Sequence, residues 1–360
     1  MSNNPSDRQT SHLSVDSDIP LLSIRDLSVM YPTRRGDMNV INALNLDVRR
    51  GEVLGLVGES GCGKSTLGKA IMRLIPQPGR ITGHLNFDGT DLLTLDESHM
   101  RDYRGRRLSM IFQDPMTSLN PIQRLDQHII EAIRVHEPNV TPEQALVRAK
   151  DLAGKLGIAA GRLNNYPHQL SGGMRQRVMI ELALALHADL IIADEPTTAL
   201  DVIVEAQFLD LLRELRAEFG LTIILITHNI GIVAELADRV AVMYAGQIVE
   251  IGDVRSVFAD PKHPYTQGLL KSIPNLNLED RALYRMDGLP PNLIAPPTGC
   301  RFNPRCPHRM EGLCDVYPPQ LLPVPENATQ LASCWLHQPH PVGYEPDTKH
   351  VIESSRSNNG

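Results

Sequence analysis

The sequence predicts an α/β fold in which a parallel sheet is wrapped by helices. Three apolar runs have the length and continuity of buried strands, at residues 53–57, 190–193 and 221–227. From Leu21 to about Ile273, short runs of this kind alternate with helical patterns. A glycine-rich loop follows the first run, and four cysteines gather near the C-terminus. These observations indicate a large α/β domain followed by a small cysteine-containing module.

Composition narrows the class of protein. Hydrophobic residues make up 42% of the 360 residues, and 35 basic against 42 acidic side chains give a net charge of −7, which disfavours a strongly basic nucleic-acid binder. The most apolar stretch, residues 178–193, is interrupted by Glu181, His187 and Asp189, so no membrane span is predicted. The first twenty residues lack the apolar segment of a secretory signal, so we expect a cytosolic protein.

Four segments are expected along the chain. Residues 1–20 and 339–360 are polar and predict disordered tails. Residues 21–273 form the main domain. Five prolines then interrupt any long element and indicate a linker into a module at 274–338; they are Pro274, Pro290, Pro291, Pro296 and Pro297.

The first buried run leads into a phosphate-binding loop. Residues 58–65 read G-E-S-G-C-G-K-S and match the G-x-x-x-x-G-K-[ST] pattern between a strand and a helix that is expected from Thr66 to about Leu74. Glycines let backbone N–H groups surround a phosphate, and the helix presents its positive end to the anion. Lys64 would reach the β- and γ-phosphates and Ser65 would ligate Mg²⁺. The nucleotide-contacting residues are therefore Ser60, Gly61, Cys62, Gly63, Lys64, Ser65 and Thr66.

Polar residues end the other two runs. Asp194 would hold magnesium through its water shell, and Glu195 would polarise a water for attack on the γ-phosphate. His228 follows the third run, and the ends of parallel strands converge on one crevice. We expect these side chains to meet at the phosphate loop.

A second anion-binding segment reads L-S-G-G-M at residues 170–174, before a helical run. Ser171, Gly172 and Gly173 offer a hydroxyl, bare amides and a helix N-terminus. The presence of two anion-binding segments in one chain is explained if the second contacts a nucleotide that another subunit holds.

With these motifs in order, residues 21–273 resemble the ATP-binding subunits of ABC transporters. The resemblance implies an ABC-type P-loop ATPase cassette with a RecA-like core, an antiparallel β subdomain and a helical signature subdomain. It also implies that Tyr31 stacks on adenine and that Gln113 touches magnesium and water and faces the permease, in a surface extending to about Asn120. Glu195 matches the catalytic glutamate, His228 the switch histidine and residues 199–201 the D-loop. Met174 departs from the glutamine that is commonest at that position of the signature.

The subfamily is also indicated. The segments H-P-Y-T at 263–266 and G-C-R-F-N-P-R-C at 299–306 resemble the C-terminal signature of oligopeptide, dipeptide and nickel importers. This resemblance implies an ATPase that powers peptide uptake, with nickel or another small solute as the alternative. It implies a location at the cytoplasmic face of the membrane. The implied partners are a homologous second ATPase, two transmembrane permease subunits and an extracytoplasmic substrate-binding protein, and no nucleic acid.

The cysteine cluster predicts a metal site. Cys300, Cys306, Cys314 and Cys334 are separated by five, seven and nineteen residues. A structural zinc site usually contains a close C-x₂₋₄-C pair, whereas a [4Fe–4S] cluster binds each thiolate on a different iron. The cluster also fits the module of the importers that the chain resembles. We expect [4Fe–4S], with zinc and four unrelated buried thiols as the alternatives.

The sequence disfavours three other classes of protein. A soluble ABC ATPase that acts on DNA or the ribosome usually has two cassettes or a long coiled coil, and the interval from Gln113 to Ser171 is too short for one. A redox protein is disfavoured because the C-x₂-C spacing of ferredoxins is absent from the sequence. Kinases and small GTPases share the phosphate loop but have no Ser-Gly-Gly segment.

Overall fold

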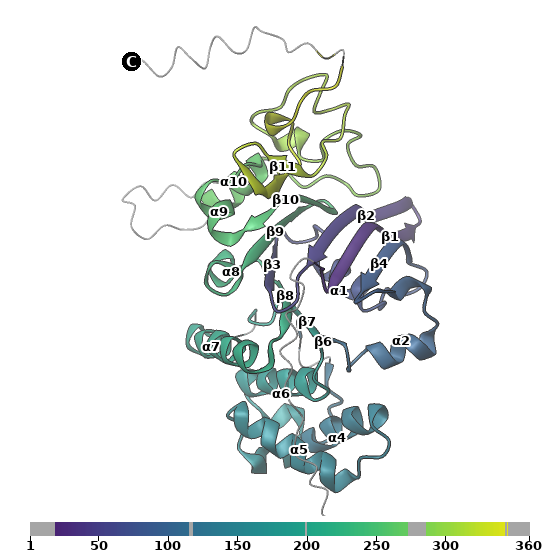
Figure 1. Cartoon of the computed structure of the whole chain (residues 1–360), viewed down its shortest axis with the longest axis vertical. Coiled ribbons are helices and arrows are strands. Elements are labelled where there is room, and N and C mark those ends of the chain that lie inside the picture. The colour runs from purple at the N-terminus through teal and green to yellow at the C-terminus, as the bar shows by residue number, and fades with distance from the viewer. Residues whose placement is uncertain (1–18, 115–117, 199, 273–285, 343, 345–360) are drawn as a thin grey trace, which may run out of the picture.

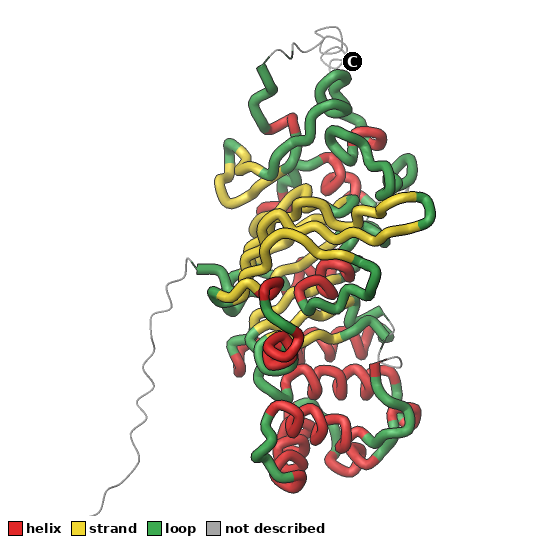
Figure 2. Tube along the Cα trace, turned by 90° about the vertical axis from the view of Figure 1, so that its right-hand side faces the viewer, coloured by secondary structure: helices red, strands yellow, loops and turns green. Residues whose placement is uncertain are grey.

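Two sheets and a helical lobe make up the chain (Figure 1). The computed structural model describes residues 19–114, 118–198, 200–272, 286–342 and 344. Nearly all of both predicted tails, and much of the predicted linker, lie outside these residues. In Figure 2 the strands form a central band, with the helical lobe on one side and the loop-rich C-terminal region on the other.

The first sheet is antiparallel, with strand order β2-β1-β4-β5. Side chains of Leu22, Ile24, Leu27 and Val29 are fully buried on β1, which gives the near-alternating pattern of a sheet with one covered face. The strands are β1 (Leu22–Thr33), β2 (Gly36–Val48), β4 (Arg80–Phe87) and β5 (Thr90–Asp91). This sheet corresponds to the expected antiparallel subdomain.

The second sheet has the order β11-β12-β10-β9-β3-β8-β7-β6. The five strands from β9 to β6 run parallel, and every residue of β3, β7 and β8 is buried, as in strands covered on both faces. The strands are β3 (Val53–Val57), β6 (Leu108–Ile111), β7 (Leu190–Asp194), β8 (Thr222–Ile226), β9 (Arg239–Tyr244), β10 (Gln247–Asp253), β11 (Leu322–Val324) and β12 (Asn327–Ala332). The three predicted buried strands are confirmed to within a residue.

The helices cover the parallel sheet and build the lobe, in which α4, α5 and α6 pack together. Thr141 caps α5 and Pro142 opens it, while α1 begins at Lys64 rather than at the expected Thr66. The α-helices are α1 (Lys64–Ile71), α2 (Glu97–Tyr103), α4 (Leu125–His136), α5 (Pro142–Lys155), α6 (Gly172–Leu184), α7 (Val202–Phe219), α8 (Ile230–Leu236), α9 (Val254–Ala259) and α10 (Pro264–Lys271). Short 3₁₀ helices span Leu92–Thr94, Ala160–Asn164, Pro167–Gln169, Asn303–Arg305 and Trp335–His337.

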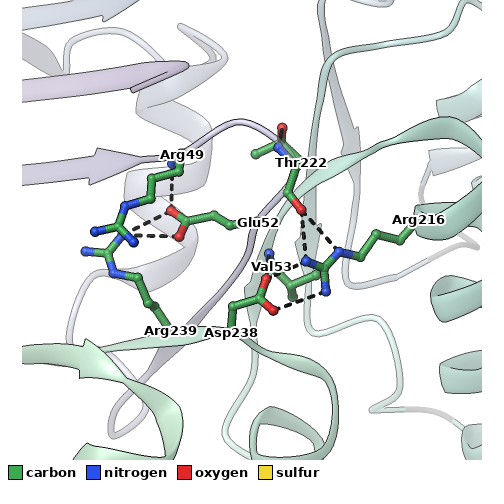
Figure 3. Close-up of polar contacts among 8 residues, drawn as sticks. Arg49, Glu52, Val53, Arg216, Thr222, Asp238 and Arg239 are labelled. Atoms are coloured by element: carbon green, nitrogen blue, oxygen red, sulfur yellow. Dashed lines mark hydrogen bonds and ion pairs between the residues drawn. The ribbon is translucent and has the colours of Figure 1, made fainter. Parts of the chain in front are cut away.

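The start of β3 is secured by a polar network that joins it to α7 and β9 (Figure 3). Asp238 accepts hydrogen bonds from the Val53 N–H at 2.8 Å and from Arg216 on α7 at 2.6 Å. Glu52 pairs with Arg239 on β9 at 3.1 Å and accepts from the Arg49 N–H at 2.7 Å. The network therefore holds the strand that leads into the phosphate loop.

The C-terminal hairpin continues the main sheet. Strand β10 pairs with β9 on one side and with β12 on the other. The sheet thus crosses the boundary predicted at residue 273, and that division of the chain stays a prediction. None of the helices in the described ranges is long and apolar enough to cross a membrane.

Candidate functional site

The phosphate loop lies between the buried strand β3 and helix α1. Its backbone has positive φ at Gly58, Gly61 and Gly63. A Cβ at Gly58 would stand 2.2 Å from the Met243 carbonyl oxygen, so β9 closes the loop from one side. Gly58 is therefore required by close backbone approach as well as by its φ angle, whereas Gly61, with nothing within 4 Å of its Cβ position, is required by its φ angle alone.

Two side chains at the start of α1 point to the site. The Lys64 ammonium is buried and donates to the carbonyl oxygens of Gly58 at 2.7 Å and Glu59 at 3.1 Å, so it lies across the loop. The Ser65 hydroxyl donates to Asp194 Oδ1 at 2.8 Å. The predicted magnesium ligands from α1 and β7 are thus brought into contact.

Asp194 is an acid in a buried position. Its side chain lies at the end of β7, and burial raises its pKa, with the neighbouring Glu195 acting in the same direction. The Ser65 hydrogen bond and the charges of Lys69 and Lys64 act against this shift. A hard divalent cation prefers oxygen donors of this kind, so the Ser65–Asp194 pair fits a magnesium site.

Glu195 collects polar groups from three segments. Its Oε2 accepts from the Gln113 amide and from the Thr198 hydroxyl, each at 3.0 Å, and its Oε1 lies 3.5 Å from His228 Nδ1. The Glu195 N–H donates to the Ile226 carbonyl at 2.8 Å, and its φ of 47° is unusual for a residue other than glycine. The structure therefore brings the three residues predicted to be catalytic to one carboxylate.

Tyr31 and the phosphate-loop helix are neighbours. Burial raises the pKa of the Tyr31 hydroxyl, and the Thr66 side chain acts in the opposite direction. Both residues belong to the set predicted to contact the nucleotide. Cys62 of the loop is buried, its carbonyl accepts from the Gly246 N–H at 2.9 Å, and burial raises the pKa of its thiol.

The predicted signature segment starts the long helix of the lobe. Ser171 is the N-cap of α6, and its hydroxyl accepts from the Met174 N–H at 3.4 Å. Ser171 is exposed and Gly172 half-buried, while a Cβ at Gly173 would come within 2.6 Å of Val204 Cγ1 on α7. This segment is a helix N-terminus that solvent, or another chain, can reach.

Parts of two predicted motifs fall outside the described residues. These are 115–117 in the surface that follows Gln113, and Ala199 in the D-loop. Asp201 is described: it caps α7 and accepts from the Val204 N–H at 2.9 Å.

The four clustered cysteines line one small cavity of about 10 Å³, together with His263, Phe302 and Trp335. All four are free thiols. Burial raises the pKa of Cys300 to about 12, with Cys314 and Cys306 adding to it, and it raises the pKa of Cys334 to about 12 as well. Among the described residues, no group of three or more His, Cys, Asp or Glu side chains is arranged to hold a metal ion. The structure therefore brings the four thiols to one cavity, and a bound metal stays a prediction.

Sequence reasoning missed two residues that contact the site. Thr198 bonds the nearby Glu195, although its position two residues after a proline carries no distinguishing signal. Glu59 lies inside the motif at a variable position, yet its carboxylate pairs with Arg305 at 2.8 Å. Only the folded chain brings Arg305 to Glu59.

A phosphate loop, an adjacent serine–aspartate pair and a glutamate directly after that aspartate at the end of β7 define a P-loop ATPase. The ABC transporter model matches residues 41–198, and the model of the oligopeptide/dipeptide transporter C-terminal region matches residues 249–314. The chain belongs to the family of ABC transporter ATP-binding proteins that carry this C-terminal region.

Curated relatives are similar over most of their length. The oligopeptide transport ATP-binding protein OppD of Escherichia coli is 48% identical over 302 residues, which cover 83% of this chain and 89% of the relative. The dipeptide transport ATP-binding protein DppD of Bacillus subtilis is 44% identical over 321 residues, covering 88% and 94%. The resemblance inferred from the motifs is confirmed.

Solved structures share the cassette. The dimeric bacterial ABC transporter cassette MJ0796 superposes with a TM-score of 0.59 at 26% identity, covering 65% of this chain and 99% of the cassette. A second structure, with the same coverage, TM-score and identity, is described as a post-hydrolysis state of that cassette bound to ADP and Pi. The predicted ABC ATPase fold is confirmed, and this chain is an ABC-type ATPase.

Proposed function

We propose that this chain is the ATP-hydrolysing subunit of an ABC importer that powers the uptake of di- or oligopeptides across the cytoplasmic membrane. The observation that carries the proposal is the Glu195 carboxylate, placed beside the Ser65–Asp194 pair and contacted by Gln113 and His228. The peptide cargo is supported by the relatives, which are named as oligopeptide and dipeptide transport proteins. Nickel or another small solute is the alternative cargo.

The arrangement of Glu195 supports its role as the group that activates water. Oε2 already accepts two hydrogen bonds, so Oε1, which faces His228, is the freer oxygen. We infer that Oε1 takes a proton from the attacking water as its oxygen approaches the γ-phosphorus. Magnesium, held by Ser65 and Asp194, would neutralise charge on the phosphates. Lys64 orients the β- and γ-phosphates, and Tyr31 stacks on the adenine.

The exposed signature segment supports a two-subunit site. Ser171, Gly172 and Gly173 would contact the γ-phosphate of a nucleotide held by a homologous second ATPase, and its signature would do the same here. Loss of the γ-phosphate on hydrolysis removes this contact and lets the pair open. Through the surface at Gln113, this motion reaches two permease subunits. The chain therefore works at the cytoplasmic face of the membrane, with an extracytoplasmic binding protein that selects the peptide.

The test is Glu195→Gln in the assembled complex with its permease. Glutamine keeps the size but accepts no proton, so turnover should fall by about 100-fold or more while ATP affinity stays within about twofold. The matched control is Glu205→Gln on α7, which should leave turnover unchanged. Wild-type turnover in Glu195→Gln would contradict the proposed role. Recovery of ribosomes or DNA, rather than of permease subunits, in pull-downs would favour the alternative class of soluble ABC ATPase.

We further propose that the cysteine cavity holds a [4Fe–4S] cluster that stabilises the C-terminal module, with zinc as the alternative. Support comes from the four thiols that line one cavity, since four cysteine sulfurs are the donor set of such a cluster. The group would be structural, because Lys64, Asp194 and Glu195 supply the chemistry on ATP.

Anaerobically purified chain should be brown and contain about four irons per chain. Cys306→Ser should lose the iron and still bind ATP, whereas Cys62→Ser, in the phosphate loop, should keep it. Colourless protein that carries one zinc per chain would replace the cluster with the zinc alternative.

A further inference from the structure

We propose that Arg305 is a positioning residue for the phosphate loop and that the cysteine module sets the affinity for ATP through it. The inference rests on the proposed function, because it concerns regulation of the same ATP site. It joins two parts of the chain that are 246 residues apart in sequence.

The contact is a two-pronged ion pair. Arg305 Nη1 donates to Glu59 Oε2 at 2.8 Å, and Nη2 donates to Glu59 Oε1 at 3.0 Å. The Arg305 side chain is 5% exposed and that of Glu59 27%. Planar pairs of this kind fix orientation as well as distance, and they are screened less than surface pairs.

Arg305 is itself held in place. Its guanidinium lies 5.7 Å from the ring centre of Tyr244 and 6.0 Å from that of Phe302, and its Nε donates to the Asp287 carbonyl at 3.0 Å. Stacking and hydrogen bonding together leave the side chain few alternative conformations. A rigid cation therefore faces Glu59.

A second contact fixes the backbone of the same loop residue. The Glu59 N–H donates to the Tyr265 hydroxyl at 2.8 Å, and the Tyr265 ring is fully buried, 4.6 Å from the Tyr244 ring centre and 5.5 Å from that of Phe302. The Glu59 carbonyl accepts from the Lys64 ammonium at 3.1 Å. Residues of the C-terminal region thus contact both the backbone and the side chain of Glu59, which also contacts Lys64, the phosphate-binding lysine.

The link to the cysteines is a single short segment, residues 300–306. Its first and last residues, Cys300 and Cys306, line the cavity. Between them, Arg301 donates to the Ala245 carbonyl beside the loop, and Arg305 reaches Glu59. Whatever orders this segment also orders the phosphate loop.

The direction of the effect on ATP affinity follows from the charges of Glu59 and Arg305. Glu59 is a carboxylate beside a site for a polyanion, and Arg305 neutralises it. Removing the arginine leaves an unpaired negative charge near the phosphates, which opposes ATP binding. Removing both charges should restore much of the affinity.

The experiment is a double-mutant cycle on the full chain, with a fluorescent ATP analogue as the probe. Arg305→Met should weaken binding by about tenfold, equivalent to about 1.4 kcal/mol. Arg305→Lys should lose less, because a point charge cannot form both hydrogen bonds. The matched control is Arg309→Met, an exposed arginine of the same module, which should change affinity by less than about twofold.

The double variant Glu59→Gln with Arg305→Met distinguishes positioning from loss of fold. It should regain most of the affinity that Arg305→Met loses, and Arg305→Met should raise the KM for ATP by a larger factor than it lowers kcat. Unchanged affinity in Arg305→Met, or losses that simply add in the double variant, would overturn the inference. Lys64→Ala that still binds ATP would instead contradict the proposed function.

Discussion

The two anion-binding segments of this chain differ in what holds them. The phosphate loop is enclosed by backbone, since a Cβ at Gly58 would stand 2.2 Å from a carbonyl oxygen of β9. The signature segment begins a helix of the lobe with an exposed Ser171, and Gly173 meets only a valine side chain. The phosphate loop is thus part of the core, whereas the signature segment is exposed, as the proposed two-subunit ATP site requires.

The largest expected effect tests how tightly the core encloses the phosphate loop. Gly58→Ala should cost about 3 to 5 kcal/mol of unfolding free energy, because the new methyl group meets backbone and the φ of 154° disfavours side chains. Gly61→Ala, whose Cβ has nothing within 4 Å, should cost about 1 to 2 kcal/mol from its φ alone. Urea unfolding of the two variants measures both. Equal losses would mean that the close approach at Gly58 has no energetic weight.

The second prediction concerns the signature helix. Glu181 is fully buried on α6, neither carboxylate oxygen has a hydrogen-bond partner among the described residues, and burial raises its pKa to about 8. The pKa of Glu181 is higher in the folded chain than in the unfolded chain. The contribution of this carboxyl group to the free energy of unfolding is therefore fully present below about pH 4 and is lost as the pH rises toward 8. At pH 7 the loss is on the order of 3 kcal/mol.

Glu181→Gln should remove this pH dependence, since the amide does not ionise. The measurement is urea unfolding at pH 5 and pH 7.5, where the wild type should lose stability and the variant should not. Glu214→Gln, on the exposed face of α7, is the matched control and should follow the wild type. Parallel curves for wild type and Glu181→Gln would show that the carboxyl group has a partner in solution.

The smallest effect tests the exposed half of the ATP site. Ser171→Ala removes a hydroxyl that would reach the second subunit's nucleotide, and turnover of the assembled complex should fall by about 30-fold, or about 2 kcal/mol. ATP affinity of the chain alone should stay unchanged, because its own phosphate loop is intact. Weaker ATP binding by the isolated Ser171→Ala chain would contradict the proposed two-subunit site, since both segments would then contact one nucleotide.

Prediction from sequence succeeded where the pattern is local. The buried strands and the phosphate loop each depend on contiguous residues, so composition and spacing report them directly. The approach of His228 to Glu195 was also expected, because parallel strands end at one edge, whereas the place of Gln113 was implied only by the family resemblance. Helix α1 begins two residues earlier than expected, since Lys64 has helical backbone while its side chain serves the loop.

The sequence by itself determined the chemistry of the ATP site, because each reacting group lies in a short motif whose backbone conformation is set by its own residues. Only the tertiary structure decided that Arg305 pairs with Glu59. The physical reason is separation along the chain. Hydrophobic periodicity and short motifs can be recognised in contiguous residues, whereas the partner of a buried charge depends on which distant segments pack against it.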